Sequence, residues 1–248
     1  MNHFFADPSD ISGNDIILRG DDHNHIKNVL RLKKDDVISV SDGVSDREYR
    51  CHIESFGDGF VHCRLDFIKE AGCELPVRVR LFQCLPKSDK MDHIVQKTVE
   101  LGVCEIIPVS SKRAVVKLDE KKAEAKVKRW NAISEAAAKQ SKRSHIPQVK
   151  DVMGFEEAVK AAGDSDTALI PYELSSGFSF TRDILEGLSD NKDISVFIGP
   201  EGGFDEDEVK LAKEAGIIPV SMGKRILRTE TAGPVFLAWL VYRFEDRG

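Results

Sequence analysis

Apolar and polar residues alternate with a period of two along the first third of the chain, a pattern typical of β-strands. Residues 37–40 read as a strand that ends at a Ser-Asp-Gly turn. Residues 50–53 and 60–65 flank the turn 56–59, which contains two glycines and predicts a hairpin. A short amphipathic helix is expected at 22–31. The pattern therefore predicts a small, mostly β domain, interpreted as a barrel.

From residue 77 onward the pattern changes to strands alternating with helices. The expected strands are 77–85, 105–109, 167–170, 194–198 and 217–221, and the expected helices are 88–102, 119–140, 155–162, 205–215 and 231–244. Such alternation predicts an open, mostly parallel sheet with helices on both faces. The Gly- and Pro-containing stretch 71–76 separates the β-rich pattern from the alternating strand-and-helix pattern. We therefore expect two domains, 1–72 and 73–248.

Charge is distributed unevenly along the chain. The net charge of −6 by itself disfavours a nucleic-acid partner, but residues 112–150 carry 12 Lys/Arg against 4 Asp/Glu, a local charge of +8. This segment is either a nucleic-acid contact or the solvated face of a long helix. No apolar run approaches the roughly 18 residues of a membrane helix, and the N-terminus lacks signal-peptide features. A cytoplasmic protein is expected.

Cysteine and histidine usage gives no sign of a disulfide framework or a metal site. The five cysteines are odd in number, widely spaced and without a C-x-x-C pair. We interpret them as reduced residues, mostly half-buried in strands. His23 and His25 form the one histidine pair that could ligate a metal, but no carboxylate or thiol constellation frames it. A surface pair and no metal are expected.

Three predicted strand ends run into unusual loops. The strand 194–198 is followed by Gly-Pro-Glu-Gly-Gly, the strand 217–221 by a loop with two arginines beside an apolar pair, and the strand 167–170 by Pro-Tyr-Glu. Ligands of open α/β sheets bind at the carboxyl ends of strands, and glycine permits close approach to the backbone. Ordinary strand-to-helix turns need fewer such residues. The three loops together predict a single ligand pocket.

The motifs G-P-E-G-G-F at 199–204 and G-x-R-I-L-R-T-E-T-A at 223–232 resemble the signature of SPOUT-class methyltransferases. The form is that of the 16S rRNA uridine-N3 methyltransferases. Segments 25–32, 87–90, 99–102 and 135–143 agree, so the similarity covers essentially the whole chain. One departure is Lys142, in a stretch where glycine is expected. The early G-x-G-x-x-G loop of a Rossmann domain is missing, which disfavours an NAD-dependent enzyme.

The resemblance implies an RNA-binding, PUA-like β-barrel at 1–72 and a methyltransferase domain with a deep trefoil knot at 73–248. It also implies a homodimer, S-adenosylmethionine as the cofactor, and 16S rRNA or the small ribosomal subunit as the partner. The residues expected to bind the cofactor come from the three loops and the helix that follows. They are Ile170, Pro171, Tyr172, Glu173, Ile198, Gly199, Pro200, Glu201, Gly203, Ser221, Met222, Gly223, Ile226, Leu227, Arg228, Thr231 and Ala232.

Methyl transfer to N3 of uridine requires loss of the imide proton, so a base or a nearby cation must assist. Arg228 is the candidate for orienting the uracil or stabilising its anion, and Glu201 is the candidate base. Glu230 is either a further polar group of the site or a helix cap. The residues expected to bind RNA are Arg19, Lys27, Arg31, Lys112, Arg113, Lys139, Lys142 and Arg143. Two alternatives stay open: a SPOUT enzyme acting on another RNA, for example by ribose methylation of transfer RNA, and a non-catalytic RNA-binding module.

Overall fold

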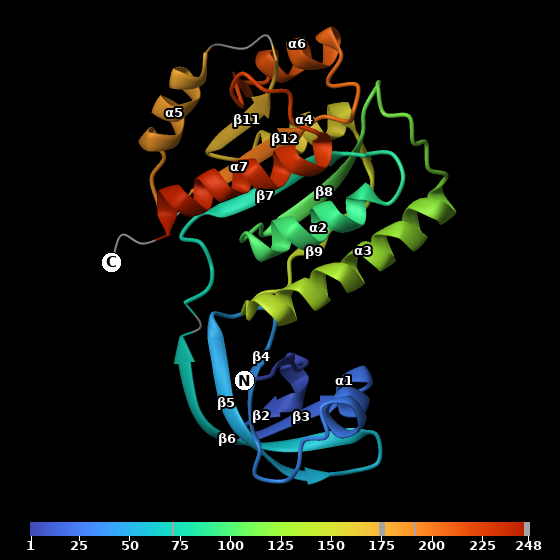
Figure 1. Ribbon diagram of the computed structural model, residues 1–248, viewed down its shortest axis with the longest axis vertical. Coiled ribbons are helices and arrows are strands. Elements are labelled where there is room, and N and C mark those ends of the chain that lie inside the picture. The colour runs from blue at the N-terminus through green and yellow to red at the C-terminus, as the bar shows by residue number, and fades with distance from the viewer. Residues whose placement is uncertain (71, 174–176, 191, 246–248) are drawn as a thin grey trace. The chain divides into compact units, whose positions relative to one another are not determined.

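The computed structural model describes residues 1–70, 72–173, 177–190 and 192–245, which divide between two compact units (Figure 1). The first unit comprises Met1–Glu74 and Ala138–Ile146, and the second comprises Leu75–Ala137 and Pro147–Gly248. Residue 71 of the expected 71–76 linker lies outside the described residues. The chain thus passes from one unit to the other three times, and the sequence pattern had led us to expect only one such passage.

The first unit is built on one six-stranded sheet. Its elements are β1 (His3–Phe5), the 3-10 turn η1 (Pro8–Asp10), β2 (Ile11–Ser12), β3 (Asp15–Arg19), α1 (Asp21–Asn24), the π-helical turn η2 (His25–Val29), β4 (Val37–Ser41), β5 (Arg47–Phe56) and β6 (Phe60–Glu70). The strand order is β1-β4-β5-β6-β3-β2. Every pair is antiparallel except β1 with β4. The mostly antiparallel sheet confirms the expected β domain.

Alternation along the strands produces the core of this unit. Ile16 and Leu18 of β3, Cys51 and Ile53 of β5, and Val61 of β6 are each at most 1 % exposed. They lie two residues apart on their strands, so they share the face of the sheet that packs inward. The hairpin between β5 and β6 closes through Gly57, whose amide donates to the carbonyl of Phe60 at 2.9 Å.

Segment 138–146, at the end of the long helix α3 (Glu120–Ser141), contacts the rest of the first unit through several polar interactions, among them a buried ion pair. Arg143 is only 3 % exposed, and its Nε donates to the Glu74 carboxylate at 3.1 and 3.2 Å. The same carboxylate accepts from the amides of Ser144 (3.2 Å) and His145 (3.3 Å). A buried charge is tolerated only when it is paired and hydrogen-bonded, and here it is both.

The second unit alternates strands and helices as expected. Its elements are β7 (Arg78–Cys84), α2 (Lys90–Glu100), β8 (Glu105–Ser110), most of α3, β9 (Gln148–Val149), β10 (Met153–Gly154), α4 (Phe155–Ala162), β11 (Thr167–Pro171), α5 (Phe178–Gly187), β12 (Asp193–Ile198), α6 (Glu206–Glu214), β13 (Ile218–Val220) and α7 (Thr229–Phe244). The strand order is β10-β8-β7-β12-β11-β13, with β9 pairing β8. All of these pairs are parallel.

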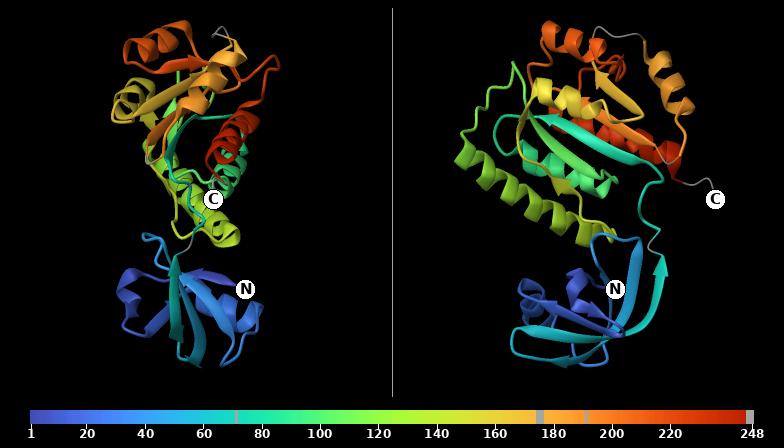
Figure 2. Two further views of the ribbon diagram at one scale, coloured as in Figure 1. Left: turned by 90° about the vertical axis from the view of Figure 1, so that its left-hand side faces the viewer. Right: turned by 180° about the vertical axis from the view of Figure 1, so that it is seen from behind.

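Helices cover both faces of this sheet (Figure 2). Helix α2 packs with α7, and α4 packs with α6. On the α4–α6 face, Phe82 of β7 and Phe197 of β12 stack with ring centroids 4.5 Å apart, and Phe155 meets Phe197 at 6.0 Å. Aromatic rings bury large apolar areas, so this cluster anchors the helices to the sheet. The arrangement confirms the predicted α/β class.

Three features of the second unit differ from the sequence prediction. The strands β9 and β10 have two residues each, too few for a periodic signal. Helix α5 begins in a Ser- and Gly-containing stretch that reads as a loop, and only Thr181 and Leu185 of it are buried. Helix α7 starts at Thr229, two residues earlier than expected. In each case the local sequence pattern is weak, and the structure depends on contacts with residues that are distant along the chain.

Among the described residues, no helix combines the length and the apolar character needed to cross a bilayer.

The end of α3 yields a prediction about stability. Lys142 has a φ of +60°. The amide of Arg143 donates to the carbonyl of Ala138 at 3.0 Å, and the amide of Lys142 donates to the carbonyl of Lys139 at 3.3 Å. These bonds form a Schellman motif, in which glycine is the preferred left-handed residue. Lys142→Gly is expected to raise the free energy of unfolding by about 1 kcal/mol, measured by urea denaturation. Lys142→Ala loses the same charge but keeps the strained φ, so equal stability of the two variants would contradict the explanation.

Candidate functional site

The three predicted loops lie at one edge of the second unit's sheet. Strand β12 pairs with β11, and β11 pairs with β13, all in parallel. Their carboxyl ends therefore meet, and the segments that follow them share this edge (Figure 1). Part of the loop after β11, residues 174–176, lies outside the described residues. The expectation that the three strand ends converge is confirmed by this topology.

The loop after β12 is shaped by glycine and anchored at both ends. Gly203 has a φ of +66°, and its amide donates to the carbonyl of Pro200 at 2.9 Å to close a tight turn. A Cβ added to Gly199 would lie 3.2 Å from the ring of Phe204, closer than ordinary contact. Phe204 is buried in the aromatic cluster, and Asp205 caps α6 through the amide of Asp207. Close packing at Gly199 and the left-handed turn at Gly203 explain both glycines.

The loop after β13 exposes the residues expected to meet a ligand. Thr181 of α5 holds its start, accepting from the amide of Ser221 at 2.9 Å and donating to its carbonyl at 3.0 Å. Gly223 has a φ of +97°. Ile226 is 83 % exposed, and Arg228, also exposed, precedes the first turn of α7. A single exposed apolar side chain is common on protein surfaces, so the contact of Ile226 with a ligand stays a prediction.

A buried polar bridge joins the loops to the middle of the sheet. Gln83 of β7 is fully buried, and its Nε2 donates to Thr229 Oγ1 at 2.9 Å. Thr229 Oγ1 in turn donates to the carbonyl of Gly199 at 2.7 Å. Gln83 is not among the site residues predicted from the sequence. The signal available was a glutamine within the apolar run of residues 81–85, and a buried sheet tolerates such a side chain only when its amide is hydrogen-bonded.

A chain of ion pairs lies beside the glycine-rich loop. Lys90 Nζ contacts Glu201 at 2.9 Å and Glu230 at 3.2 Å, and the amide of Lys87 donates to Glu201 at 3.1 Å. Partial burial opposes ionisation of Glu201, but the hydrogen bonds from Lys90 and from backbone amides outweigh it and lower the pKa of this carboxyl group. The same contacts raise the pKa of Lys90. A carboxylate with a lowered pKa is a weaker base, which bears on the role predicted for Glu201.

Glu230 is held as an anion by its own helix. A backbone hydrogen bond at the start of α7 is the largest cause of its lowered pKa, and Lys90 and Arg228 contribute further. Carboxylates are stabilised at helix N-termini by the free amides and the helix dipole. Of the two interpretations of Glu230, its place at the start of α7 favours the helix-terminal one.

The residues expected to bind the cofactor divide among these elements. Ile170 to Glu173 lie at the end of β11, Ile198 to Gly203 at the end of β12, and Ser221 to Arg228 after β13. Thr231 and Ala232 lie in the first turn of α7; Thr231 is exposed and Ala232 is buried. The structure thus brings these residues to one edge of one sheet. Their contacts with a ligand stay a prediction.

The residues expected to bind RNA belong to both units. Arg19, Lys27, Arg31, Lys139, Lys142 and Arg143 lie in the first unit, and Lys112 and Arg113 lie in the second. Lys27, Arg31 and Lys142 are exposed. Arg19 pairs with Asp10 at 3.1 Å, and Lys139 with Asp22 at 3.0 Å. The burial of Arg143 against Glu74 favours a structural role for that side chain.

Lys112 and Arg113 lie among carboxylates. Lys112 Nζ contacts Asp205 at 2.7 Å and Asp207 at 2.9 Å, and these contacts raise its pKa. Arg113 pairs with Asp205 at 3.4 Å and donates to the carbonyl of Gly202 at 3.3 Å. Both cations therefore brace the glycine-rich loop and the start of α6. Their positive charge is already compensated locally.

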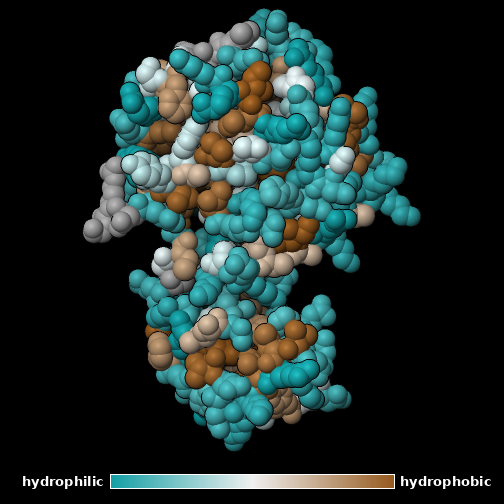
Figure 3. Space-filling model, viewed as in Figure 1, coloured by the Kyte–Doolittle hydropathy of each residue, from teal (hydrophilic) through white to brown (hydrophobic). Residues whose placement is uncertain are grey.

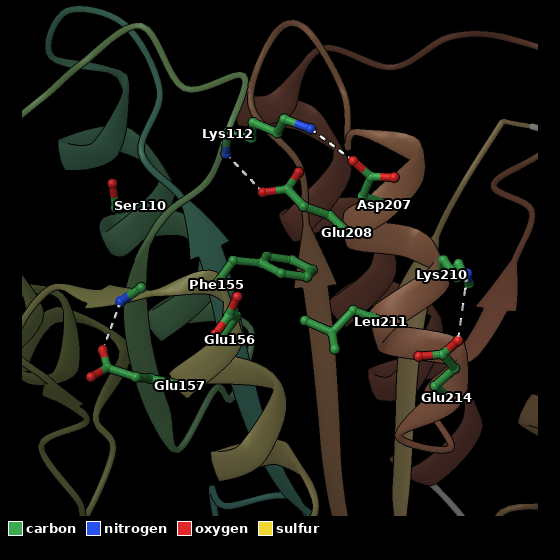
Figure 4. A pocket seen from close by; sticks show the side chains of 11 residues that line it. Ser110, Lys112, Phe155, Glu156, Glu157, Asp207, Glu208, Lys210, Leu211 and Glu214 are labelled. Carbon is green, nitrogen blue, oxygen red and sulfur yellow. Dashed lines mark hydrogen bonds and ion pairs between the residues drawn. The ribbon is translucent and has the colours of Figure 1, made fainter.

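A groove of about 810 Å³ lies between α4 and α6 (Figure 4). Its lining contains the carboxylates Glu156, Glu157, Asp207, Glu208 and Glu214. Among the predicted site residues only Lys112 lines it, and that amine points toward Asp207. The excess of negative charge makes this groove unsuited to a phosphate backbone, and this counts against an RNA contact through Lys112.

Comparison with known proteins places these features in a family. The profile of an RNA methyltransferase domain matches residues 73–241, and that of an RNA methyltransferase PUA domain matches residues 18–66. The chain is 37 % identical to "Ribosomal RNA small subunit methyltransferase E" of Bacillus subtilis over 92 % of this chain and 90 % of that protein.

Two solved structures share the fold over nearly the whole chain. One is a ribosomal RNA small subunit methyltransferase E from Neisseria gonorrhoeae bound to S-adenosylmethionine, with a TM-score of 0.85 and 30 % identity over 98 % of both chains. The other is a putative methyltransferase from Legionella pneumophila with the same bound cofactor, with a TM-score of 0.84, 29 % identity, and coverage of 97 % of this chain and 96 % of that chain. This protein therefore belongs to the family of RNA methyltransferases that includes the ribosomal RNA small subunit methyltransferases E.

Proposed function

We propose that this protein methylates N3 of a specific uridine in the 16S RNA of the small ribosomal subunit, using S-adenosylmethionine. The observation that carries the proposal is the convergence of the two glycine-rich loops at the carboxyl edge of β12, β11 and β13. Relatives similar over nearly the whole chain bear the small-subunit methyltransferase name, and two of the similar solved structures hold the cofactor.

The residues at this edge fit such a cofactor. A Cβ added to Gly203 would meet nothing within 4 Å, so the backbone of the loop faces open space at this residue. Backbone amides and carbonyls there can contact the polar edge of an adenine, and exposed Ile226 can cover its face. Bound there, S-adenosylmethionine would supply an electrophilic methyl group on a sulfonium. The chain itself must hold the target base in line with that methyl group.

The reaction requires the bond between N3 and the methyl carbon to form as the carbon–sulfur bond breaks, while the N3 proton leaves. N3 lies on the Watson–Crick edge, so the target must be unpaired or turned out of a helix. Exposed Arg228 is suited to orient the uracil and to stabilise negative charge on it. Glu201 was the candidate base. Its ion pair with Lys90 lowers its basicity, so we assign it chiefly to holding Lys87 and Lys90 beside the loop.

We further propose the domain roles that the resemblance implies: RNA binding for 1–72, as a PUA-like barrel, and methyl transfer for 73–248, with a trefoil knot. Two hydrogen bonds support the knot. The chain leaves β13 at the edge of the sheet, yet it returns to place Thr229 against Gly199 and Gln83, on the far side of β11. In a trefoil knot the C-terminal segment passes through a loop formed earlier in the chain, and this requires the chain to cross back over β11 in the same way.

A direct test combines cofactor binding with nucleoside analysis. The purified protein is expected to bind S-adenosylmethionine by calorimetry and to form 3-methyluridine in small-subunit RNA. Gly203→Ala should weaken binding at least tenfold, because it strains the turn and fills space at the ligand edge. Gly216→Ala is the matched control, since Gly216 also has a positive φ and an open Cβ direction but lies at the end of α6. Equal affinities for the two variants would remove the loop from the site.

The same assay separates the alternatives. A 2′-O-methylated nucleoside, or methylation of transfer RNA alone, would show a SPOUT enzyme with another substrate. RNA binding without any cofactor binding would show a non-catalytic module.

A homodimer is proposed from the surface of the last helix. Tyr242 of α7 is 90 % exposed, and Phe178 and Phe180 of α5 are 46 % and 40 % exposed. Apolar side chains gather over α7 in the space-filling view (Figure 3). Exposed apolar patches of this kind mark interaction surfaces. Light scattering at micromolar concentration is expected to give twice the mass of one chain, and Tyr242→Glu should lower it. A monomeric mass for the unaltered protein would refute the dimer.

RNA binding is expected to depend on the exposed cations of the first unit. The side chains of Lys27 and Lys142 are exposed to solvent. Each phosphate contact releases counterions, so Lys27→Ala with Lys142→Ala should weaken RNA binding and flatten its salt dependence by a slope of about 1 to 2. S-adenosylmethionine affinity should not change. Lys34→Ala, another exposed lysine of this unit, is the control; an unchanged slope in the double variant would place RNA elsewhere.

A further inference from the structure

The buried bridge from Gln83 through Thr229 to Gly199 has a fixed direction. The carbonyl of Gly199 only accepts, so the hydroxyl of Thr229 must donate to it, at 2.7 Å. The hydroxyl then has only its lone pairs for Gln83, so Gln83 must present its Nε2, which donates at 2.9 Å. The second Nε2 proton goes to the carbonyl of Cys84 at 3.0 Å. Each donor in the bridge is thus used once.

With its amide in this orientation, Gln83 leaves its own side-chain oxygen unpaired. Gln83 Oε1 is buried and accepts no hydrogen bond from any of the described residues. A buried acceptor without a partner is unfavourable, and an apolar residue in β7 would avoid it. Helix capping does not explain Thr229 either, because Arg228 is the N-cap residue and makes no side-chain capping bond, while the Thr229 hydroxyl turns to Gly199. The role of the two side chains is therefore to connect β7, the start of α7 and the loop after β12.

We infer that Gln83 and Thr229 are positioning residues of the cofactor site. They fix the Gly199 carbonyl, at the start of the loop 199–204, against the first turn of α7, which directly follows Arg228. The spacing between the two glycine-rich loops is then set from the middle strand β7 and not from the loops themselves. Neither side chain need touch the ligand. This inference rests on the proposed function, since it assigns a role within the S-adenosylmethionine site.

The test compares variants that remove or keep the hydroxyl. Thr229→Val has nearly the same shape but cannot donate, and it should weaken S-adenosylmethionine binding roughly tenfold, as expected for loss of one buried hydrogen bond. Thr229→Ser keeps the donor and should stay within about twofold of the unaltered protein. With saturating cofactor, Thr229→Val should recover most of its turnover rate, so that KM for the cofactor rises while kcat changes little.

Thr98→Val is the matched control for a buried threonine. Thr98 is fully buried in α2, and its hydroxyl donates to the carbonyl of Ile94 at 2.8 Å within its own helix. Its loss should lower thermal stability without changing cofactor affinity. Gln83→Leu is a second variant, because it removes the hydrogen bond from β7 to Thr229 and the unpaired acceptor together. Combined with Thr229→Val it should weaken binding little beyond either single change, since both act on one bridge.

The outcomes are separable. Unchanged cofactor affinity in folded Thr229→Val and Gln83→Leu would overturn the inference and leave the proposed function standing. Equal loss of affinity in Thr229→Ser and Thr229→Val would also overturn it, because the hydroxyl would then be irrelevant. If the unaltered protein does not bind S-adenosylmethionine, the proposed function fails and the inference fails with it.

Discussion

Parallel pairing of the strands in the second unit governs the rest of its structure. Parallel neighbours need a crossover between them, and the crossovers here are mostly helices that bury both faces of the sheet. All carboxyl ends then lie at one edge, so loops that are distant in sequence share one neighbourhood. The order β12-β11-β13 brings three of them together without any contact specific to a ligand. The chemistry that we propose for the site depends on that arrangement.

Charge in this protein is organised by pairing more than by local density. The basic stretch 112–150 carries +8 in sequence, yet Lys112 faces two aspartates, Lys139 faces Asp22, and Arg143 is buried against Glu74. Such pairs set the conformation of loops and helix ends. A positive segment in a sequence is therefore a poor measure of the field that an RNA would meet, because partners from elsewhere in the fold compensate part of it.

The sequence predicts those features that depend on neighbouring residues. The glycine-rich turns, the buried strands and the helices α2, α4 and α6 follow from local patterns, and the two motifs carry the resemblance to the family. Gln83 and Arg143 could not be placed, because their partners lie 146 and 69 positions away along the chain. The short strands β9 and β10 depend on pairing with β8 and have no pattern of their own. Lys142 was predicted only in part. The resemblance led us to expect glycine at this position, and the backbone there is left-handed, as glycine favours, although the residue is lysine.

The segment 138–146 has a consequence for how this architecture can be divided. A fragment that ends near residue 74 would keep all six strands of the first unit but would lose Arg143, leaving the Glu74 carboxylate without its guanidinium. Conversely, a fragment that starts near residue 75 would keep Arg143 but lose Glu74 and most of the unit to which Arg143 belongs. Because an uncompensated charge of this kind is strongly unfavourable, the two units are interdependent in sequence although each is compact. Exchange of the N-terminal unit between homologous proteins would therefore have to transfer two separate pieces of chain together.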